Sequence, residues 1–486
     1  MSASIKSLEP QNLWKNFANL NAVPRASKKE EQVIKFAKSF GENLGLDTKV
    51  DSVGNVVIKK PATKGMEDRQ TVVMQSHLDM VHQKNADTVF DFAKEGIKMF
   101  TDDDWVKAEG TTLGADNGIG VAAIMALLES KDIPHPALEA LFTIDEETGM
   151  TGAKELDGSL LSGQIMLNLD TEEDNELCIG CAGGIDSNTY LKYKERTPRK
   201  DGMAFKIGVT GLKGGHSGMD IHLGRGNANK LMNRLLYKTT DKYSMRISEV
   251  DGGSLRNAIP RESFATIVVP KGKKDKFLAE FDRRKSDILT EFNSIEPDLS
   301  IEIEEAKMPK SVMGPGKQRK ILNAIYAVPN GVFRMSPDIP DLVETSSSFA
   351  RVQIKNGEFI TQSLQRSSIE SGKEDIANAI RATFEAIGAE VKNANTYPGW
   401  APNAQSPILK TMENLYRKMF NEEPHVAACH AGLECGIIGT RKSGLDMISF
   451  GPTIRGAHSP DEKVSISSVQ KFWKFLLATL AETPTK

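Results

Sequence analysis

The sequence has little cysteine and no long apolar run. Its 486 residues contain four cysteines, too few for the disulfide framework of a secreted protein. Neither the N-terminus nor any later stretch is apolar over the length of a signal peptide or a membrane span. These absences predict a cytoplasmic protein with no membrane partner.

An excess of charge of either sign is also missing. Lys and Arg number 62 against 65 Asp and Glu, a formal net charge of -3, which argues against nucleic acid as a partner. A four-cysteine zinc site is disfavoured as well, because Cys429 and Cys435 lack the spacing of a zinc knuckle. We interpret these two and the pair Cys178 and Cys181 as small packing residues.

The length predicts two or three domains. Strand-like and helix-like segments alternate in 1–186 and again in 400–486, which predicts one α/β domain in two parts. Between them, residues 187–399 carry basic and polar segments around short strands, typical of a separate α+β domain. The predicted fold is therefore an α/β domain interrupted by an inserted α+β domain.

The stretch Thr71–Val81 reads as a buried strand that ends in His77 and Asp79. Residues two apart on an extended segment point to the same side. His77 could therefore bind a metal while Asp79 orients it. The alternative is a hydrogen-bonded pair at the end of a strand.

A glycine-rich segment, 110–118, places Asp116 at the entrance of a small-residue helix. Such a loop can bind phosphate, but a Walker Lys-Ser/Thr is missing and Asp116 would repel an anion. Two interpretations remain for Asp116, a metal ligand and a helix cap.

Other carboxylates follow apolar strands in the same way. Glu146 and Glu147 follow the strand 138–144 and should point in different directions, so they should have different roles; Asp170 ends the strand 164–170. His458 lies in the loop 452–460. Buried carboxylates at strand ends are costly unless they are paired, protonated or metal-bound.

Two local patterns have more ordinary interpretations. Asp102, Asp103 and Asp104 could form a calcium or magnesium site, but a solvated loop is the better interpretation. Ser27 and Glu30 form a capping-box pattern that predicts a helix beginning at Ser27.

In open α/β sheets, sites form at the edge where strands end, so these histidines and carboxylates should meet. A mixed set of imidazole and carboxylate ligands suits zinc, cobalt or manganese better than calcium. The pattern indicates a two-metal hydrolase with a further carboxylate as the general base.

The motifs are Ser-His77-Leu-Asp79, Gly-Ala-Asp116-Asn-Gly, Asp-Glu146-Glu147-Thr-Gly, Asn-Leu-Asp170 and Gly-Ala-His458-Ser. In this order they resemble the site motifs of the co-catalytic zinc M20 metallopeptidases. The resemblance extends over nearly the whole chain, including the stretches 23–27, 178–184 and 430–434. It implies a two-metal exopeptidase domain with a mixed sheet flanked by helices, interrupted by a lid at 187–399.

The resemblance also implies roles for these residues and two zinc ions, with cobalt or manganese as substitutes. Asp116 would bridge the metals. His77 and Asp170 would complete the ligands of one metal, and Glu147 and His458 those of the other. Glu146 would be the general base, and Asp79 would orient His77.

The lid should supply groups that bind the substrate. His216 and Asn257 match family positions that stabilise the oxyanion. Arg366 is the candidate for the substrate carboxylate, and Glu434, outside the lid, is the candidate for the substrate amine. The ordinary alternatives are an exposed His on a turn, a surface Arg on a strand and a buried structural carboxylate.

Within the family, the resemblance is to members that hydrolyse unblocked dipeptides of the Xaa-His type. The alternatives are an aminoacylase or a tripeptidase with the same metal site, or a catalytically silent relative that binds metal or peptide. The lid is about twice the usual length for the family, which removes the need for a homodimer without forbidding one.

Overall fold

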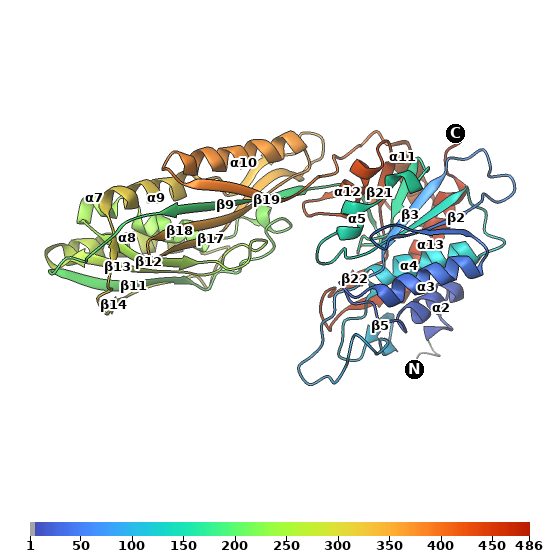
Figure 1. Cartoon of the computed structure of the whole chain (residues 1–486), viewed down its shortest axis with the longest axis horizontal. Coiled ribbons are helices and arrows are strands. Elements are labelled where there is room, and N and C mark those ends of the chain that lie inside the picture. Colours follow the sequence, from blue (N-terminus) through green and yellow to red (C-terminus); the bar gives the residue numbers. More distant parts are fainter. Residues whose placement is uncertain (1–4) are drawn as a thin grey trace. The chain divides into compact units, whose positions relative to one another are not determined.

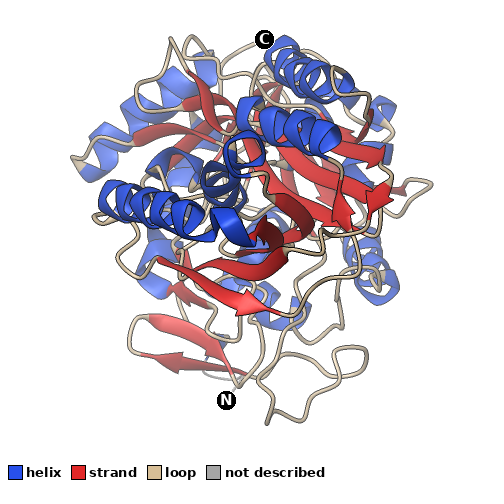
Figure 2. Cartoon of the chain, turned by 90° about the vertical axis from the view of Figure 1, so that its left-hand side faces the viewer, coloured by secondary structure: helices blue, strands red, loops and turns tan. Residues whose placement is uncertain are grey.

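The computed structural model describes residues 5–486, which form two compact units. The first unit takes the described residues up to Gly180, with Trp400–Ala428 and Leu433–Lys486. The second takes Cys181–Gly399 and Cys429–Gly432. Figure 1 shows their helices and strands in chain order, and Figure 2 shows them by type.

The first unit is built on an eight-stranded sheet in the order β1-β2-β6-β3-β7-β21-β8-β20. The pairs β6–β3, β3–β7 and β7–β21 are parallel, whereas β1–β2 and β2–β6 are antiparallel. Parallel strands end at one edge of the sheet, so the loops that follow them lie close together. The strands of this sheet are β1 (Asp47–Val50), β2 (Val56–Lys60), β3 (Val72–His77), β6 (Leu138–Thr143), β7 (Ile165–Asn168), β8 (Glu176–Cys181), β20 (His425–Cys429) and β21 (Asp446–Ser449).

A second, four-stranded sheet of this unit has the order β22-β23-β5-β4. Its strands are β4 (Met99–Asp102), β5 (Trp105–Ala108), β22 (Ile454–Arg455) and β23 (Lys463–Ser465). The sheet therefore joins a segment near residue 100 to one near residue 460.

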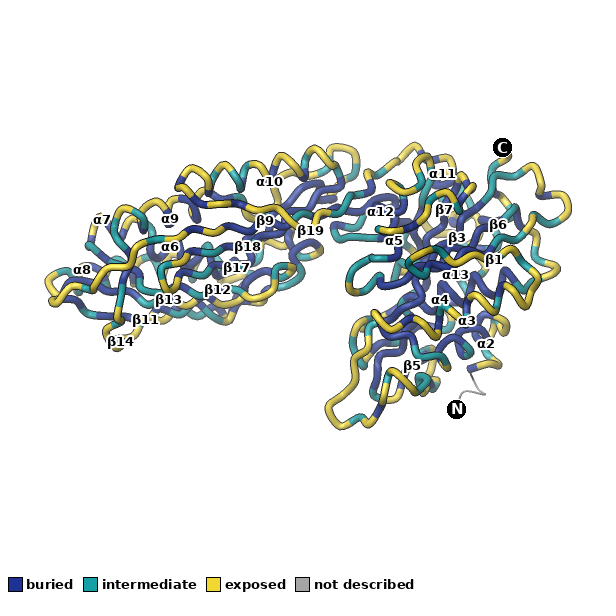
Figure 3. Tube along the Cα trace, in the orientation of Figure 1, coloured by how far each residue is buried: buried dark blue, intermediate teal, exposed yellow. Residues whose placement is uncertain are grey.

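The central helix of the first unit is α4, whose residues are apolar on all sides. Of its residues, only Asp116 and Glu129 are not buried, because α4 lies between α2 and β3 (Figure 3). The helices of this unit are α2 (Gln11–Leu20), α3 (Glu31–Asn43), α4 (Ala115–Glu129), α5 (Thr151–Glu155), α11 (Pro407–Phe420), α12 (Glu434–Arg441) and α13 (Ile466–Ala481).

The second unit is an antiparallel sheet with its helices packed against it. The order is β14-β11-β13-β12-β17-β18-β9-β19, and β16 pairs with β17. Its strands are β9 (Gly183–Lys192), β11 (Gly202–Thr210), β12 (Arg246–Gly252), β13 (Ser263–Pro270), β14 (Ser300–Ala306), β16 (Gly331–Met335), β17 (Val343–Lys355), β18 (Glu358–Ser367) and β19 (Glu390–Tyr397), and a separate pair is formed by β10 (Glu195–Arg196) and β15 (Val312–Met313).

One apolar core joins this sheet to its helices, with Phe277, Phe281 and Phe384 from the helices and Phe205, Phe349 and Phe359 from the strands. The helices are α6 (Ala228–Leu236), α7 (Thr239–Tyr243), α8 (Lys274–Phe292), α9 (Pro315–Ala327) and α10 (Glu370–Glu385). The outer faces of α8 and α10 are exposed (Figure 3).

Three sequence interpretations can be compared directly with the fold. The composition change at Ser187 lies inside β9, which belongs to the second unit because it pairs along its length with β18. The start predicted for one helix, Ser27, is wrong, since the helix is present as α3 and begins at Glu31. The Asp102–Asp104 segment forms the connection between β4 and β5, where Asp102 forms an ion pair with Lys107.

Within residues 5–486 no helix is long and apolar enough to cross a membrane.

Replacing Phe384 tests whether the apolar core of the second unit is assigned correctly. Its side chain is fully buried, with ring centroids 6.2 Å from Phe349 and 5.9 Å from Phe359. We expect Phe384→Ala to lower the free energy of unfolding by about 3–5 kcal/mol, because the change leaves a cavity. Phe333→Ala is the matched control, since Phe333 is 50% exposed. Urea denaturation followed by circular dichroism measures both, and equal losses would contradict the assigned core.

Candidate metal centre

The candidate ligands gather at the edge where the parallel strands end. His77 is the last residue of β3, Glu146 and Glu147 follow β6, and Asp170 follows β7. Asp116 lies in the first turn of α4, in a non-helical conformation. His458 comes from the loop between β22 and β23. Strand ends, one helix start and one loop therefore deliver the predicted ligands.

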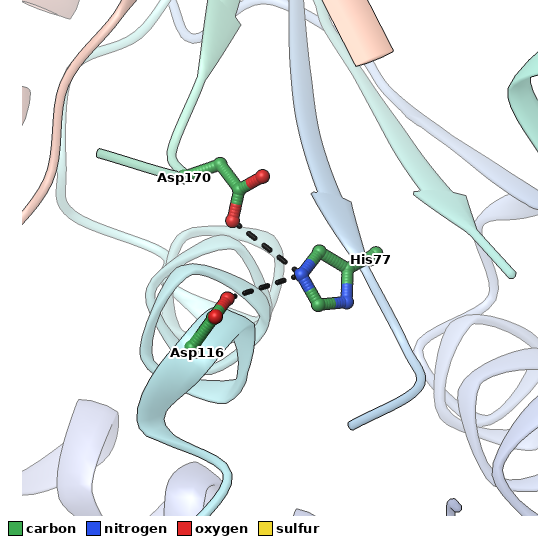
Figure 4. A group of neighbouring side chains, drawn as sticks. All are labelled: His77, Asp116 and Asp170. Carbon is green, nitrogen blue, oxygen red and sulfur yellow. Dashed lines mark hydrogen bonds and ion pairs between the residues drawn. The ribbon is translucent and has the colours of Figure 1, made fainter. Parts of the chain in front are cut away.

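A first group is formed by His77, Asp116 and Asp170. Nε2 of His77 lies 3.2 Å from Oδ1 of Asp116 and 3.4 Å from Oδ1 of Asp170. In Figure 4 the two carboxylates converge on this one imidazole nitrogen. One ligand atom from each residue lies within 4.8 Å of the others, so a single metal ion could contact all three.

A second group shares Asp116 with the first. Nε2 of His458 lies 3.2 Å from Oδ2 of Asp116 and 3.0 Å from Oε2 of Glu147, and these three residues could also hold a metal ion. Each oxygen of Asp116 faces a different histidine. This is the arrangement expected of a carboxylate that bridges two metals.

Asp79 is completely buried and holds the loops on both sides of it. Nδ1 of His77 lies 3.1 Å from the Asp79 carbonyl oxygen and 3.4 Å from its Oδ1. The Asp79 carboxylate also accepts hydrogen bonds from the backbone N–H of Glu146, at 3.0 Å, and of Glu147, at 3.3 Å. Ser27, expected to cap a helix, instead donates to Oδ2 of Asp79 at 2.8 Å. Asp79 therefore contacts Nδ1 of His77 and is hydrogen-bonded to the backbone of both glutamates.

Glu462 was missed by the sequence reasoning, although it shapes the site. Its carboxylate accepts the backbone N–H groups of 113–116, at 2.7 to 3.2 Å. These are the free N–H groups at the entrance of α4. Glu462 thus caps the helix, and the side chain of Asp116 is left to face the two histidines.

Several carboxylates of the cluster are buried next to one another, which disfavours their ionised forms. Burial raises the pKa of Asp170 to about 6 and that of Glu146 well above its usual value, and nearby carboxylates add to both effects. Hydrogen bonds that His458 donates to the carboxylates of Asp116 and Glu147 raise the pKa of its imidazole to about 11. Burial opposes protonation of His77, but Asp170 and Asp116 raise its pKa well above the usual value. The cluster therefore favours bound positive charge.

Two buried carboxylate oxygens of the cluster are suited to binding a metal ion. Oε1 of Glu147 is buried without a hydrogen-bond partner, and Oδ1 of Asp170 is buried with only the 3.4 Å ion pair to His77, an arrangement that is costly for a carboxylate. Two imidazoles and several carboxylates form the ligand chemistry of zinc, cobalt or manganese sites. None of the metal-competent groups in residues 5–486 contains a cysteine or a residue of the Asp102–Asp104 turn.

Glu434 lies in the first unit, at the start of α12, and is fully buried. Its Oε2 accepts hydrogen bonds from Gln75 at 2.7 Å and Thr143 at 2.6 Å, while Oε1 has no hydrogen-bond partner. Burial raises its pKa to about 8. One carboxylate oxygen is thus available to a cationic group.

The other three substrate candidates lie in the second unit. Nδ1 of His216 accepts the backbone N–H groups of Gly218 and Met219, at 3.2 and 3.0 Å, so the neutral ring carries its proton on Nε2. Burial and the Arg366 charge lower the pKa of His216. Asn257 is exposed, and its carbonyl accepts the N–H of Ser217 at 2.9 Å. The backbone of the segment that holds His216 is therefore hydrogen-bonded to the backbone of the segment that holds Asn257.

Arg366 is 5% exposed and forms no ion pair within the described residues. Its Nη1 donates to the Tyr397 hydroxyl at 2.8 Å, and its Nη2 lies 3.5 Å from Nε2 of His216. Two N–H donors this close can share one anionic oxygen.

Comparison with known proteins identifies the family. The model of peptidase family M20/M25/M40 matches residues 73–482. The chain belongs to this family. It is accordingly a metallopeptidase, and the resemblance seen in its motifs is confirmed.

Relatives match over the full length of this M20 peptidase. The cytosol non-specific dipeptidase of Escherichia coli (strain K12) is 41% identical over 484 residues, which covers 100% of both chains. The aminoacylhistidine dipeptidase of Vibrio alginolyticus is 42% identical, with a TM-score of 0.94 over 99% of this chain and 98% of that one. Aminopeptidase PepT of Bacillus cereus, 17% identical with a TM-score of 0.56 over 98% and 99%, shares the fold. The predicted mixed α/β fold of the family is confirmed.

The shared carboxylate gives a direct test of the metal centre. We expect the wild-type protein, loaded with zinc and freed of excess metal, to keep about two metal ions per chain. Asp116→Asn should keep fewer than one, because a neutral amide cannot bridge two cations. Asp102→Asn is the control, since Asp102 is exposed at the end of β4. Metal analysis by mass spectrometry measures the ratio, and an unchanged ratio in Asp116→Asn would contradict the bridging role.

Proposed function

We propose that this M20 peptidase is a two-metal dipeptidase that hydrolyses unblocked dipeptides, with Xaa-His as the preferred class. The observation that carries the proposal is Asp116, which faces His77 with one oxygen and His458 with the other. The relatives at 41% and 42% identity support the substrate class, since both are named dipeptidases and one of them an aminoacylhistidine dipeptidase.

His77, Asp170 and Asp116 would hold one metal, and Asp116, Glu147 and His458 the other. Zinc suits this ligand set best, with cobalt or manganese as substitutes. Bound there, the metals would polarise the peptide carbonyl and make a water molecule a stronger nucleophile.

Glu146 is the proposed general base. It takes a proton from the attacking water and returns it to the leaving amine nitrogen as the C–N bond breaks. Its raised pKa, which results from burial among other carboxylates, suits both steps. Asp79 holds its backbone N–H, so the carboxylate starts from a fixed position.

The remaining candidates bind the substrate. Nε2–H of His216 and the amide of Asn257 donate to the oxyanion that forms on the carbonyl. Arg366 binds the C-terminal carboxylate, and Oε1 of Glu434 the N-terminal ammonium. A substrate with both termini free offers a charged partner to each of these two residues. The lid predicted at 187–399 would thus bind the substrate.

The role of Glu146 is tested by Glu146→Gln. Loss of general-base catalysis should lower kcat about 100- to 10,000-fold, while metal content should stay at the wild-type value because the proposal makes Glu146 the base and not a ligand. Glu155→Gln, at an exposed position of α5, is the matched control and should keep full activity. Near-normal turnover by metal-loaded Glu146→Gln would refute the assignment.

Substrate choice is tested with four compounds, an Xaa-His dipeptide, its C-terminal amide, its N-acetyl derivative and a tripeptide. We expect wild-type kcat/KM to fall about 10- to 100-fold for the amide, because hydrogen bonds between charged groups contribute about 1.5–3 kcal/mol. Arg366→Met should abolish this difference between dipeptide and amide.

Arg381→Met, at a half-buried ion-pair residue of α10, is the control and should retain the difference. Preference of the wild type for the N-acetyl compound or the tripeptide would instead favour an aminoacylase or a tripeptidase. Retained discrimination in Arg366→Met would show that another group binds the carboxylate.

A further inference from the structure

Arg25, just beyond α2, joins two loops of the metal centre through one guanidinium group. The residue is 2% exposed. Its Nη1 donates to the carbonyl oxygens of Leu78 and Asp79, each at 3.1 Å. Its Nη2 donates to the Gly114 carbonyl at 2.5 Å and to Oδ1 of Asn21 at 2.9 Å. The loop after His77 and the loop before Asp116 are therefore held by the same planar group.

Gly114 in the second loop and Gly118 in the first turn of α4 make room for this contact. A Cβ atom at Gly114 would lie 2.4 Å from Nη2 of Arg25, and one at Gly118 would lie 2.6 Å from it. Real Cβ atoms do not approach other atoms so closely. The glycine-rich segment before α4 thus accommodates a buried arginine.

Arg25 also places a positive charge near the carboxylates of the site. None of the ion pairs among residues 5–486 includes it, and its four bonds go to neutral oxygens. Burial lowers its pKa to about 10, against the effect of Glu462 and Asp79, so it remains a cation at neutral pH. Its charge therefore offsets part of the negative charge of the site.

We propose that Arg25 is a positioning residue of the metal centre, which sets the spacing between His77 and Asp116 and thereby the metal affinity. The inference rests on the proposed two-metal function. It depends on the fork of the guanidinium, because two nitrogens must reach three carbonyls on separate loops at once. A lysine keeps the charge but offers one nitrogen.

The test is zinc affinity, measured by competition with a chromogenic chelator. Arg25→Lys should bind zinc about 10- to 100-fold more weakly, the range seen when groups that orient ligands are changed. In Arg25→Ala, millimolar guanidinium should restore part of the affinity, whereas sodium at equal ionic strength should not.

Arg284→Lys is the matched control. In the second unit, Nη1 of Arg284 likewise donates to three main-chain carbonyls, at 2.9, 3.2 and 2.7 Å. This variant should lose thermal stability in the metal-free state and keep wild-type zinc affinity. Equal losses of affinity in both lysine variants would overturn the inference, because the effect would then be general destabilisation.

Gly118→Ala provides a second route if the arginine variants fail to fold. The added methyl group presses on the guanidinium while Arg25 itself is kept, and alanine favours the helix. Zinc affinity should fall, whereas Gly316→Ala, with nothing within 4 Å of the new Cβ, should leave it unchanged.

Wild-type protein separates the two proposals. If the wild type binds no zinc, the two-metal function itself fails. If the wild type binds zinc and Arg25→Lys and Gly118→Ala bind it equally well, the function stands and the role of Arg25 is refuted.

Discussion

Repulsion between carboxylates is the constraint on which the first unit depends. Asp116, Glu146, Glu147 and Asp170 are delivered to one edge of a sheet because the strands before them are parallel or, for Asp116, because α4 starts there. Such a cluster is stable only if cations lie among the oxygens. The fold supplies imidazoles that contact the cluster and a buried guanidinium bonded to the adjoining loops, and a metal bound at the cluster would complete the balance.

Much of the precision of the site comes from contacts with the backbone. The Asp79 carboxylate accepts hydrogen bonds from the backbone of the glutamate segment, and the Glu462 carboxylate accepts them from the backbone at the start of α4. Arg25 donates to the backbone carbonyl oxygens of Leu78, Asp79 and Gly114. These bonds fix where each loop lies and leave the ligand side chains free to point inward.

The sequence was informative where the signal is local. His77, Glu146, Glu147 and Asp170 each follow an apolar strand, and the structure brings them to one edge. Glu462 escaped notice because its partners lie near residue 114 and no pattern around position 462 signals them. Ser27 was misinterpreted for a related reason: its capping-box pattern is genuine, but the hydroxyl bonds to Asp79 instead. Composition placed a boundary at Ser187, which lies inside β9, where its hydroxyl donates a buried hydrogen bond to Gln365.

The position of β21 in the large sheet has a consequence for synthesis of the chain. This strand, Asp446–Ser449, lies between β7 and β8, which are made hundreds of residues earlier. The inserted unit is continuous apart from Cys429–Gly432, so most of its contacts can form while the ribosome is still translating. The sheet that carries the ligands has an open position at its centre until nearly the whole chain has emerged. Apolar strand edges are exposed during that interval, and a chain cut short before residue 446 would hold an ordered inserted unit beside an unfinished sheet.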